Sequence, residues 1–205
     1  NSPSDFIRLR AETDSSALKK KFSNDAIYKK NLPGNNSSRS LYKIAEKIRY
    51  EKLGSKMLKG INSLLNAEVL YALRAMGHGD DLIIADTNFP SDSVARETVL
   101  GELLRIDAPA AEVVKAVLSV YPLDTFVDDS AGRMEVVGEP ESILPVMSEV
   151  QSEVSAVGGP NPMISIERYA FYERAKKAYA VIQTGERRFY GCFAFRKGVV
   201  GPEEN

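Results

Sequence analysis

The sequence predicts an α/β protein in which helices cover both faces of a sheet. Along residues 57–205, helical patterns alternate with short apolar runs that are typical of buried strands, and no internal repeat occurs. Alternation of this kind favours a sheet between two helical layers. A hydrophobic fraction of 43% and a charged fraction of 27% are ordinary for a globular chain. The length of 205 residues suits one sizeable domain with an appendage, or two small domains.

The net charge of −1 conceals two segments of opposite sign. Residues 1–56 carry 13 Lys and Arg against 6 Asp and Glu, whereas residues 57–205 carry 14 against 22. The net charge therefore changes from +7 to −8, which predicts a boundary near Met57. We expect a basic, partly helical extension over 1–56 and an α/β domain over 57–205.

Within the basic segment, apolar residues at helical spacing predict a helix over 40–52, after a loop rich in Asn, Gly and Ser. A basic segment can bind nucleic acid, but this one lacks interleaved aromatic residues and any known motif. The pattern favours a solvated appendage over a nucleic-acid partner. The stretch Arg49-Tyr-Glu-Lys-Leu-Gly54 resembles the helical amino-terminal part of a cobaltochelatase subunit, and it contains no catalytic residue.

The α/β segment divides into elements by its periodicity, its caps and its turn residues. In chain order we expect a helix over 67–76, a strand over 82–86, a turn over 88–92, a strand over 98–106, a helix over 107–121, a strand over 132–137, a helix over 145–157, a strand over 163–166, a helix over 169–177, and strands over 178–183 and 192–196.

Several functional classes are disfavoured by what the sequence lacks. One histidine and one cysteine do not suffice for a zinc site of the His/Cys type, and no nucleotide-binding glycine motif occurs. We therefore expect no cofactor and no metal. The start of the sequence has no signal-peptide core, and no apolar run approaches the roughly 18 residues of a membrane span. With a single Cys192, the expected location is the reducing cytoplasm.

The residues best suited to chemistry surround the strand predicted over 82–86. His78, the only histidine, stands between two glycines, and histidine exchanges protons near neutral pH. Asp86 follows the strand, where it can fix the histidine tautomer or bind a substrate hydroxyl. Arg168 stands where a strand meets a helix, and Tyr190 precedes the last strand. Each also has a plain structural interpretation, as a capping residue, a surface charge or a half-buried aromatic ring.

Six separated motifs together resemble the L-fucose mutarotase family, which is related to the D-ribose pyranases. They are Met76-Gly-His-Gly-Asp80, Ala85-Asp-Thr-Asn-Phe-Pro90, Ile166-Glu-Arg-Tyr-Ala-Phe-Tyr-Glu-Arg-Ala175, Thr184-Gly-Glu186, Tyr190-Gly191 and Lys197-Gly-Val199. The resemblance extends from about residue 57 to 200. It implies a three-layer α/β/α sandwich with a mixed central sheet, assembled into homo-oligomers. It also implies an isomerase that interconverts the α and β anomers of L-fucose or a similar monosaccharide, without a cofactor.

The resemblance also implies roles for individual residues. His78 matches the catalytic proton donor of the family, and Asp86 and Arg168 match residues that bind the sugar. Tyr190 and Gly191 match the first two positions of a Tyr-Gly-Asn binding segment.

The third position of that segment departs from the family, because Cys192 stands where the pattern has Asn. An amide that both donates and accepts hydrogen bonds is absent there. If the family uses this side chain, the sugar preference changes; if it uses only the backbone, little changes. A D-ribose pyranase-like enzyme and a non-catalytic monosaccharide-binding accessory protein remain alternatives. Either Tyr190 or a water molecule can take the anomeric proton.

Overall fold

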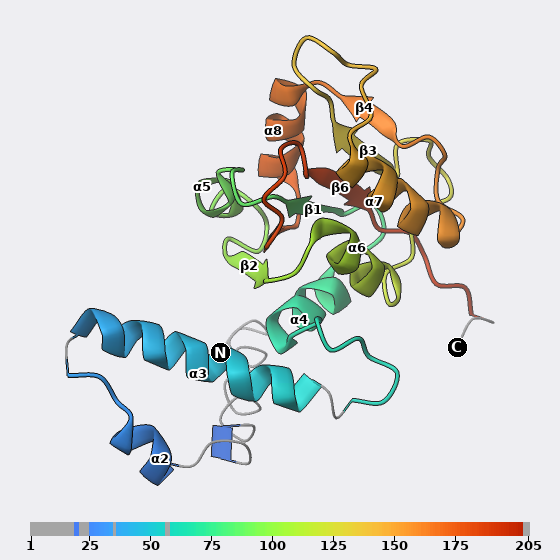
Figure 1. Ribbon diagram of the computed structural model, residues 1–205. Coiled ribbons are helices and arrows are strands. Elements are labelled where there is room, and N and C mark those ends of the chain that lie inside the picture. The colour runs from blue at the N-terminus through green and yellow to red at the C-terminus, as the bar shows by residue number, and fades with distance from the viewer. Residues whose placement is uncertain (1–18, 21–24, 35, 56–57, 203–205) are drawn as a thin grey trace. The chain divides into compact units, whose positions relative to one another are not determined.

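The structure is a computed structural model that describes residues 19–20, 25–34, 36–55 and 58–202 (Figure 1). The chain divides into two compact units between Glu68 and Val69, and each is described by itself. The boundary predicted near Met57 concerns a position outside the described residues. Within the described residues, no helix combines the length and the apolar character needed to cross a membrane.

Two helices, joined by a short irregular stretch, make up most of the described part of the first unit. It contains α2 (Asp25–Lys30) and α3 (Asn36–Ser55), so the helix predicted over 40–52 is confirmed and extends further at both ends. The rings of Tyr28 and Tyr42 join the two helices, with their centroids 5.3 Å apart.

The elements that follow alternate in type, as predicted. The helices are α4 (Ala67–Ala75), α5 (Ser91–Ala95), α6 (Ala110–Leu118), α7 (Pro145–Ala156) and α8 (Arg168–Lys177). The strands are β1 (Asp81–Ala85), β2 (Leu103–Ile106), β3 (Ala131–Met134), β4 (Ile164–Ile166), β5 (Ala180–Thr184) and β6 (Phe193–Arg196).

The sheet has the strand order β2-β5-β1-β6-β3-β4 and is mixed. All neighbouring pairs are parallel except those of β6, which runs antiparallel to both β1 and β3. The carboxyl ends of five strands and the amino end of β6 therefore share one side of the sheet, which we call the carboxyl edge. The opposite side is the amino edge.

Helices cover both faces of this sheet (Figure 1). Ile83 of β1 packs in one cluster with Val94 of α5 and Phe171 of α8. Leu82 and Ile84 are also fully buried, and they face the other way because side chains alternate along a strand. On that second face, α6 packs against α7 and β1. The predicted three-layer α/β/α sandwich is confirmed.

The predicted strand that is shortened most is the one over 98–106. The sequence predicts a strand over 98–106, but β2 begins only at Leu103, and helix α5 occupies part of the stretch predicted as a turn. The Thr98 hydroxyl donates to the Ala95 carbonyl at 2.6 Å and accepts from the Gly101 amide at 3.3 Å. These bonds form a turn after α5, and this turn occupies the first part of the stretch predicted as a strand.

A network of ion pairs lies at the amino edge. Arg174 donates from Nε and Nη2 to the two carboxylate oxygens of Asp81, both at 2.8 Å. Arg196 donates to Asp81 at 3.3 Å and to Asp129 at 2.7 Å. Because the Asp81 and Arg174 side chains are each only 14% exposed, this pair is protected from solvent screening.

Candidate functional site

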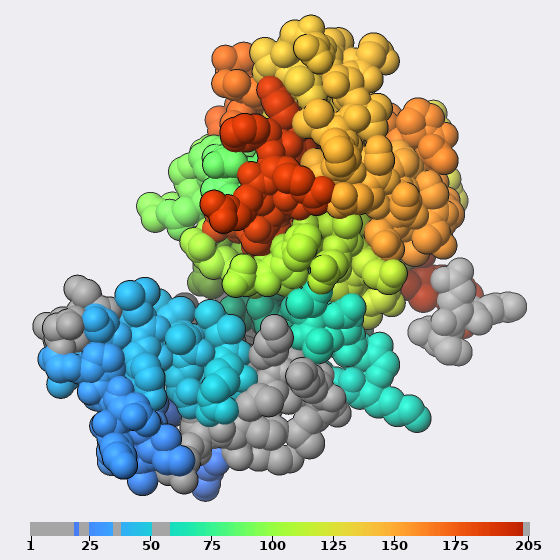
Figure 2. Space-filling model, viewed as in Figure 1, coloured from blue at the N-terminus to red at the C-terminus, as the bar shows by residue number. Residues whose placement is uncertain are grey.

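Five of the six site residues predicted from the sequence lie at the carboxyl edge. Asp86 directly follows β1, and Arg168 opens α8 directly after β4. Residues 190–192 precede β6, which lies between β1 and β3. We call Asp86, Arg168, Tyr190, Gly191 and Cys192 the carboxyl-edge cluster. In Figure 2 the red segment that leads into β6 lies on the surface beside the gold segment that precedes α7.

Asp86 joins two loops of this cluster. Its side chain is buried, and Oδ1 accepts from the backbone amides of Asn88 and Phe89 at 2.8 and 3.0 Å. Oδ2 accepts from the Gly191 amide at 3.1 Å and from the Cys192 thiol at 3.6 Å. The carboxylate thus fixes the turn after β1 and holds the entry to β6 against it.

The size of Gly191 and the burial of Cys192 suit their contacts with Asp86. A Cβ at Gly191 would lie 2.8 Å from Cγ of Glu186 and 3.3 Å from Cβ of Asp86, so only glycine fits without displacement. Cys192 is fully buried, and burial together with the Asp86 charge raises the pKa of its thiol well above the ordinary value. The thiol therefore stays protonated and donates to Asp86. Its side chain serves the loop contact rather than an open surface.

Tyr190 and Arg168 supply polar groups that the fold does not saturate. Tyr190 has φ of 59°, a left-handed conformation rare for a non-glycine residue, and its hydroxyl accepts from the Val137 amide at 3.3 Å. The Nε of Arg168 is buried and has no hydrogen-bond partner in the structure, while its guanidinium lies 5.2 Å from the centre of the Tyr169 ring. A buried donor without a partner at a polar edge is a place for a ligand oxygen.

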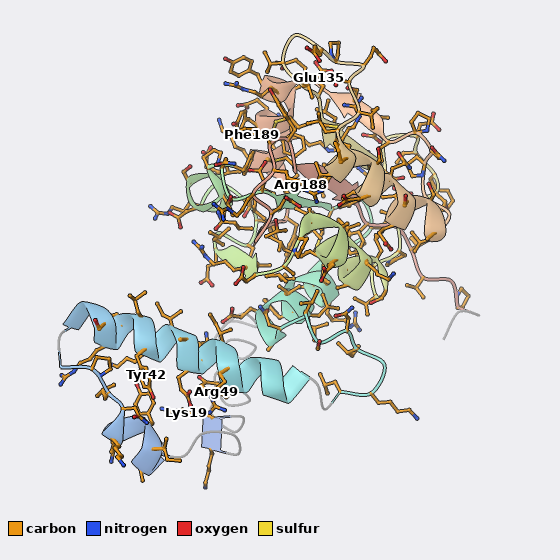
Figure 3. All side chains as sticks on the ribbon, viewed as in Figure 1. Lys19, Tyr42, Arg49, Glu135, Arg188 and Phe189 are labelled. Atoms are coloured by element: carbon orange, nitrogen blue, oxygen red, sulfur yellow. The ribbon has the colours of Figure 1, made fainter. Side chains whose placement is uncertain are left out.

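Glu186 and Arg188 belong to the same surroundings and were not selected from the sequence as site residues. Glu186 is buried and accepts from Nε and Nη2 of Arg188, at 2.9 and 2.8 Å. The guanidinium of Arg188, which is labelled in Figure 3, also donates to Glu149 of α7 at 2.7 and 2.8 Å. Hydrogen bonds from Arg188 are the main reason that the pKa of Glu186 falls to about 2. In the sequence, the motif Thr184-Gly-Glu186 was the signal that could have pointed to Glu186 as a site residue.

His78 lies at the amino edge, just before β1. Its Nε2 is 3.1 Å from Oδ2 of Asp124, a buried carboxylate whose Oδ1 accepts from the Phe126 amide at 3.0 Å. The Phe126 ring meets the imidazole edge-on, with centroids 5.9 Å apart. The imidazole remains 49% exposed and is therefore available to a partner molecule. No motif in the sequence marked Asp124.

Of the two roles considered for Asp86, fixing the His78 tautomer does not hold within one chain, and binding a substrate hydroxyl stays a prediction. The five residues of β1 separate the two side chains, and at roughly 3.3 Å per residue the strand spans about 16 Å. The tautomer of His78 is fixed by Asp124 instead. The candidate site thus consists of two parts, the carboxyl-edge cluster and the His78–Asp124 pair, at opposite edges of the sheet. Among the described residues, no three His, Cys, Asp or Glu side chains gather so that they could hold a metal ion.

A mixed α/β/α sandwich with polar side chains at the carboxyl ends of its strands defines a class of α/β proteins that bind small ligands at this edge. The chain belongs to the RbsD / FucU transport protein family, whose model matches residues 59–200. The resemblance stated from the motifs is confirmed.

Solved structures and curated relatives agree with this assignment. A fucose mutarotase of Danio rerio is 43% identical over 153 residues, which cover 72% of this chain and 97% of that protein. A putative sugar binding protein, Atu2016, has a TM-score of 0.69 and 61% identity, covering 71% of this chain and 97% of its own. The fucose mutarotase of Streptococcus pneumoniae, solved with L-fucose, has a TM-score of 0.64 and 36% identity. The match covers 70% of this chain and 100% of that protein.

The amino-terminal part has a second relationship. The model of the cobalamin biosynthesis protein CobT matches residues 1–113, more than half of the chain, so the chain belongs to that family as well through this part. The two matches overlap over 59–113, which includes β1 and Asp86.

Proposed function

We propose that this protein is a sugar mutarotase that interconverts the α and β anomers of L-fucose. The observation that carries the proposal is the carboxyl-edge cluster, in which the unpartnered Nε of Arg168 and the hydroxyl of Tyr190 share the carboxyl edge with Asp86. Arginine and carboxylate groups make the directional, charge-assisted bonds that hold sugar hydroxyls. The fucose mutarotase names of its relatives identify the sugar.

The chemistry needs only proton transfers. One group protonates the ring oxygen while another removes the proton of the anomeric hydroxyl, and the C1–O5 bond opens to the aldehyde. The aldehyde rotates, and the ring closes by the reverse transfers. Positioned acid–base groups typically contribute roughly 10²–10⁴-fold. In our proposal His78 serves the ring oxygen, Arg168 and the Asp86 turn orient the hydroxyls, and the Tyr190 hydroxyl or a water molecule takes the anomeric proton.

The position of His78 leads us to propose a homo-oligomer. The two parts of the site lie at opposite edges of one sheet, so one copy cannot bring both to the same sugar. Both parts can contact one sugar if the His78–Asp124 pair of one copy faces the carboxyl-edge cluster of another copy. Phe126, beside His78, is 71% exposed, and Phe189, beside Tyr190, is 72% exposed. Large apolar side chains exposed next to both parts support a contact between copies.

We also propose that residues 57–205 form the mutarotase domain and that 1–56 are an extension outside the sugar site, in a cytoplasmic protein. The start of the RbsD / FucU match at residue 59 supports the first statement. The single, unpaired and buried Cys192 supports a reducing compartment.

Anomer exchange measured by saturation-transfer NMR tests the function. Wild type should accelerate exchange of L-fucose, and His78→Ala should lose the acceleration while still binding the sugar. Acceleration of D-ribose alone would assign the chain to the pyranase branch. Binding without any acceleration in the wild type would favour a non-catalytic sugar-binding protein.

Mixing two inactive variants tests the shared site. His78→Ala keeps the carboxyl-edge cluster, and Arg168→Met keeps the His78–Asp124 pair, so mixed oligomers contain some intact sites and should regain activity. As a control, a mixture of His78→Ala and Asp124→Ala should show no more activity than Asp124→Ala alone, because both changes damage the same part. Failure of the first mixture to regain activity, with subunit exchange verified, would refute a site shared between copies.

A further inference from the structure

A buried carboxylate outside the proposed set of sugar-binding residues organises the turn between β5 and β6. The Oε1 atom of Glu186 accepts from the backbone amides of Arg187 and Arg188 at 3.1 and 3.0 Å. Its Oε2 atom accepts from the Ala110 amide at 3.3 Å, at the start of α6. With the two bonds from the Arg188 side chain, five donors converge on one carboxylate.

The backbone of Glu186 extends the same connection to β1. Its carbonyl accepts from the Thr87 amide at 2.9 Å, directly after Asp86. Its own amide donates to the Thr184 hydroxyl at 3.2 Å, and that hydroxyl donates to the Ala85 carbonyl at 2.9 Å. Glu186 therefore ties together the exit of β1, the start of α6 and its own turn.

The side chain of Glu186 also supports Gly191 directly. Its Cγ is the nearest atom to the space a Gly191 side chain would occupy, and Asp86 Cβ is next. Gly191 is thus enclosed between the two acidic side chains, and its amide donates to Asp86. The left-handed conformation of Tyr190 directly precedes this contact, so the direction of the Tyr190 side chain depends on where Gly191 is held.

From these contacts we infer that Glu186 is a positioning residue: its charged carboxylate sets the turn that holds Gly191 against Asp86 and presents Tyr190 to the sugar. The expected effect of Glu186 on sugar binding rests on the proposed function, whereas its expected effect on the loop does not. Glutamine at this position would turn an amide donor toward converging donors, whereas aspartate keeps the charge with a shorter reach. Glu186→Gln should therefore disturb the loop more than Glu186→Asp.

The first measurement concerns the loop and needs no activity. In amide hydrogen exchange of the full chain, Glu186→Gln should lower the protection of the Gly191 amide at least tenfold, while the Ile83 amide in the centre of the sheet keeps its protection. Glu186→Asp should restore part of the protection. Equal loss at Gly191 and Ile83 would mean general destabilisation and would overturn the inference, as would unchanged protection at Gly191.

The second measurement concerns the sugar. By saturation-transfer NMR, KM for L-fucose should rise about tenfold in Glu186→Gln, since a charge-assisted hydrogen bond is worth about that much. Glu149→Gln, which removes only the outer partner of Arg188, should leave KM within about twofold. An unchanged KM in Glu186→Gln would overturn the inference. If wild type shows no exchange, the proposed function fails, and the Gly191 protection alone decides the role of Glu186.

If Glu186→Gln does not fold, Arg188→Met replaces it in both measurements. This change removes two of the five donors and leaves the three backbone amides in place. The Gly191 protection should fall and KM should rise in the same direction by a smaller factor, about threefold. Wild-type values for both quantities would again overturn the inference.

Discussion

His78 and Asp124 form a hydrogen-bonded pair, with Nε2 and Oδ2 3.1 Å apart, although 46 positions separate them in the sequence. The carboxylate is buried and the imidazole is half exposed. A carboxylate bound to one imidazole nitrogen sets the tautomer and stabilises the protonated ring. In the proposed mechanism, proton exchange with the sugar therefore falls to the Nδ1 atom of His78.

Asp124→Asn should lower kcat for fucose exchange about tenfold or more, because an amide no longer holds the imidazole in the tautomer and orientation that the carboxylate sets. KM should change little, since in the proposed site other residues hold the sugar hydroxyls. Asp128→Asn, an exposed neighbour in the same loop, is the matched control and should match wild type. A wild-type kcat in Asp124→Asn would remove the pair from the mechanism.

Gly191→Ala should weaken sugar binding at least tenfold, because the new methyl group must displace Glu186 or Asp86. Calorimetric titration with L-fucose measures the loss. Gly34→Ala serves as the comparison, since no atom lies within 4 Å of a side chain placed there. Normal affinity in Gly191→Ala would show that the close approach of the two loops is not required.

Asp81→Asn should destabilise the fold by about 2–4 kcal/mol, since it leaves the Arg174 and Arg196 side chains without their shared carboxylate in a partly buried site. Urea denaturation gives the difference in the free energy of unfolding. Asp92→Asn, at an exposed pair with Arg96, should cost less than about 1 kcal/mol. Equal costs in the two variants would argue against a special role for the amino-edge network.

The stability of the fold should decrease at acidic pH, in part because Glu186 becomes protonated. The pKa of this carboxyl in the folded protein, about 2, lies below its ordinary value of 4.5. A lowered pKa stabilises the fold above the ordinary value, and this contribution is lost as the pH falls from about 4.5 toward 2. The melting temperature of Glu186→Gln should therefore fall less steeply over that interval than that of wild type. Parallel curves would contradict the assignment.

The order and type of the elements were predictable because the local signals agree with the tertiary structure. The run from Leu82 to Ala85 is apolar enough to be read as a buried strand, and Asp86 at its end was placed correctly. The helix at Pro145 begins where proline fits a first turn. Strand 98–106 was overestimated because apolar periodicity does not reveal the side-chain bonds that Thr98 makes with the backbone.

The candidate site was less predictable because strand order is a long-range property. Nothing in the sequence shows that β6 enters the sheet beside β1 in the antiparallel direction, and this arrangement brings Gly191 to Asp86. For the same reason, the sequence did not reveal Asp124 as the carboxylate that contacts His78. Asp124 reaches His78 through a chain segment that bridges Leu123 to Lys197, a contact with no local signature.

The antiparallel strand β6 has a consequence for how the protein tolerates change. It connects residues 190–192 at one edge with Lys197 at the other, where the Lys197 carbonyl accepts from the Gly79 amide beside His78 at 2.8 Å. One four-residue strand thus acts as a rigid spacer between the two ends of the molecule. A single inserted or deleted residue in β6 would move both ends out of alignment together.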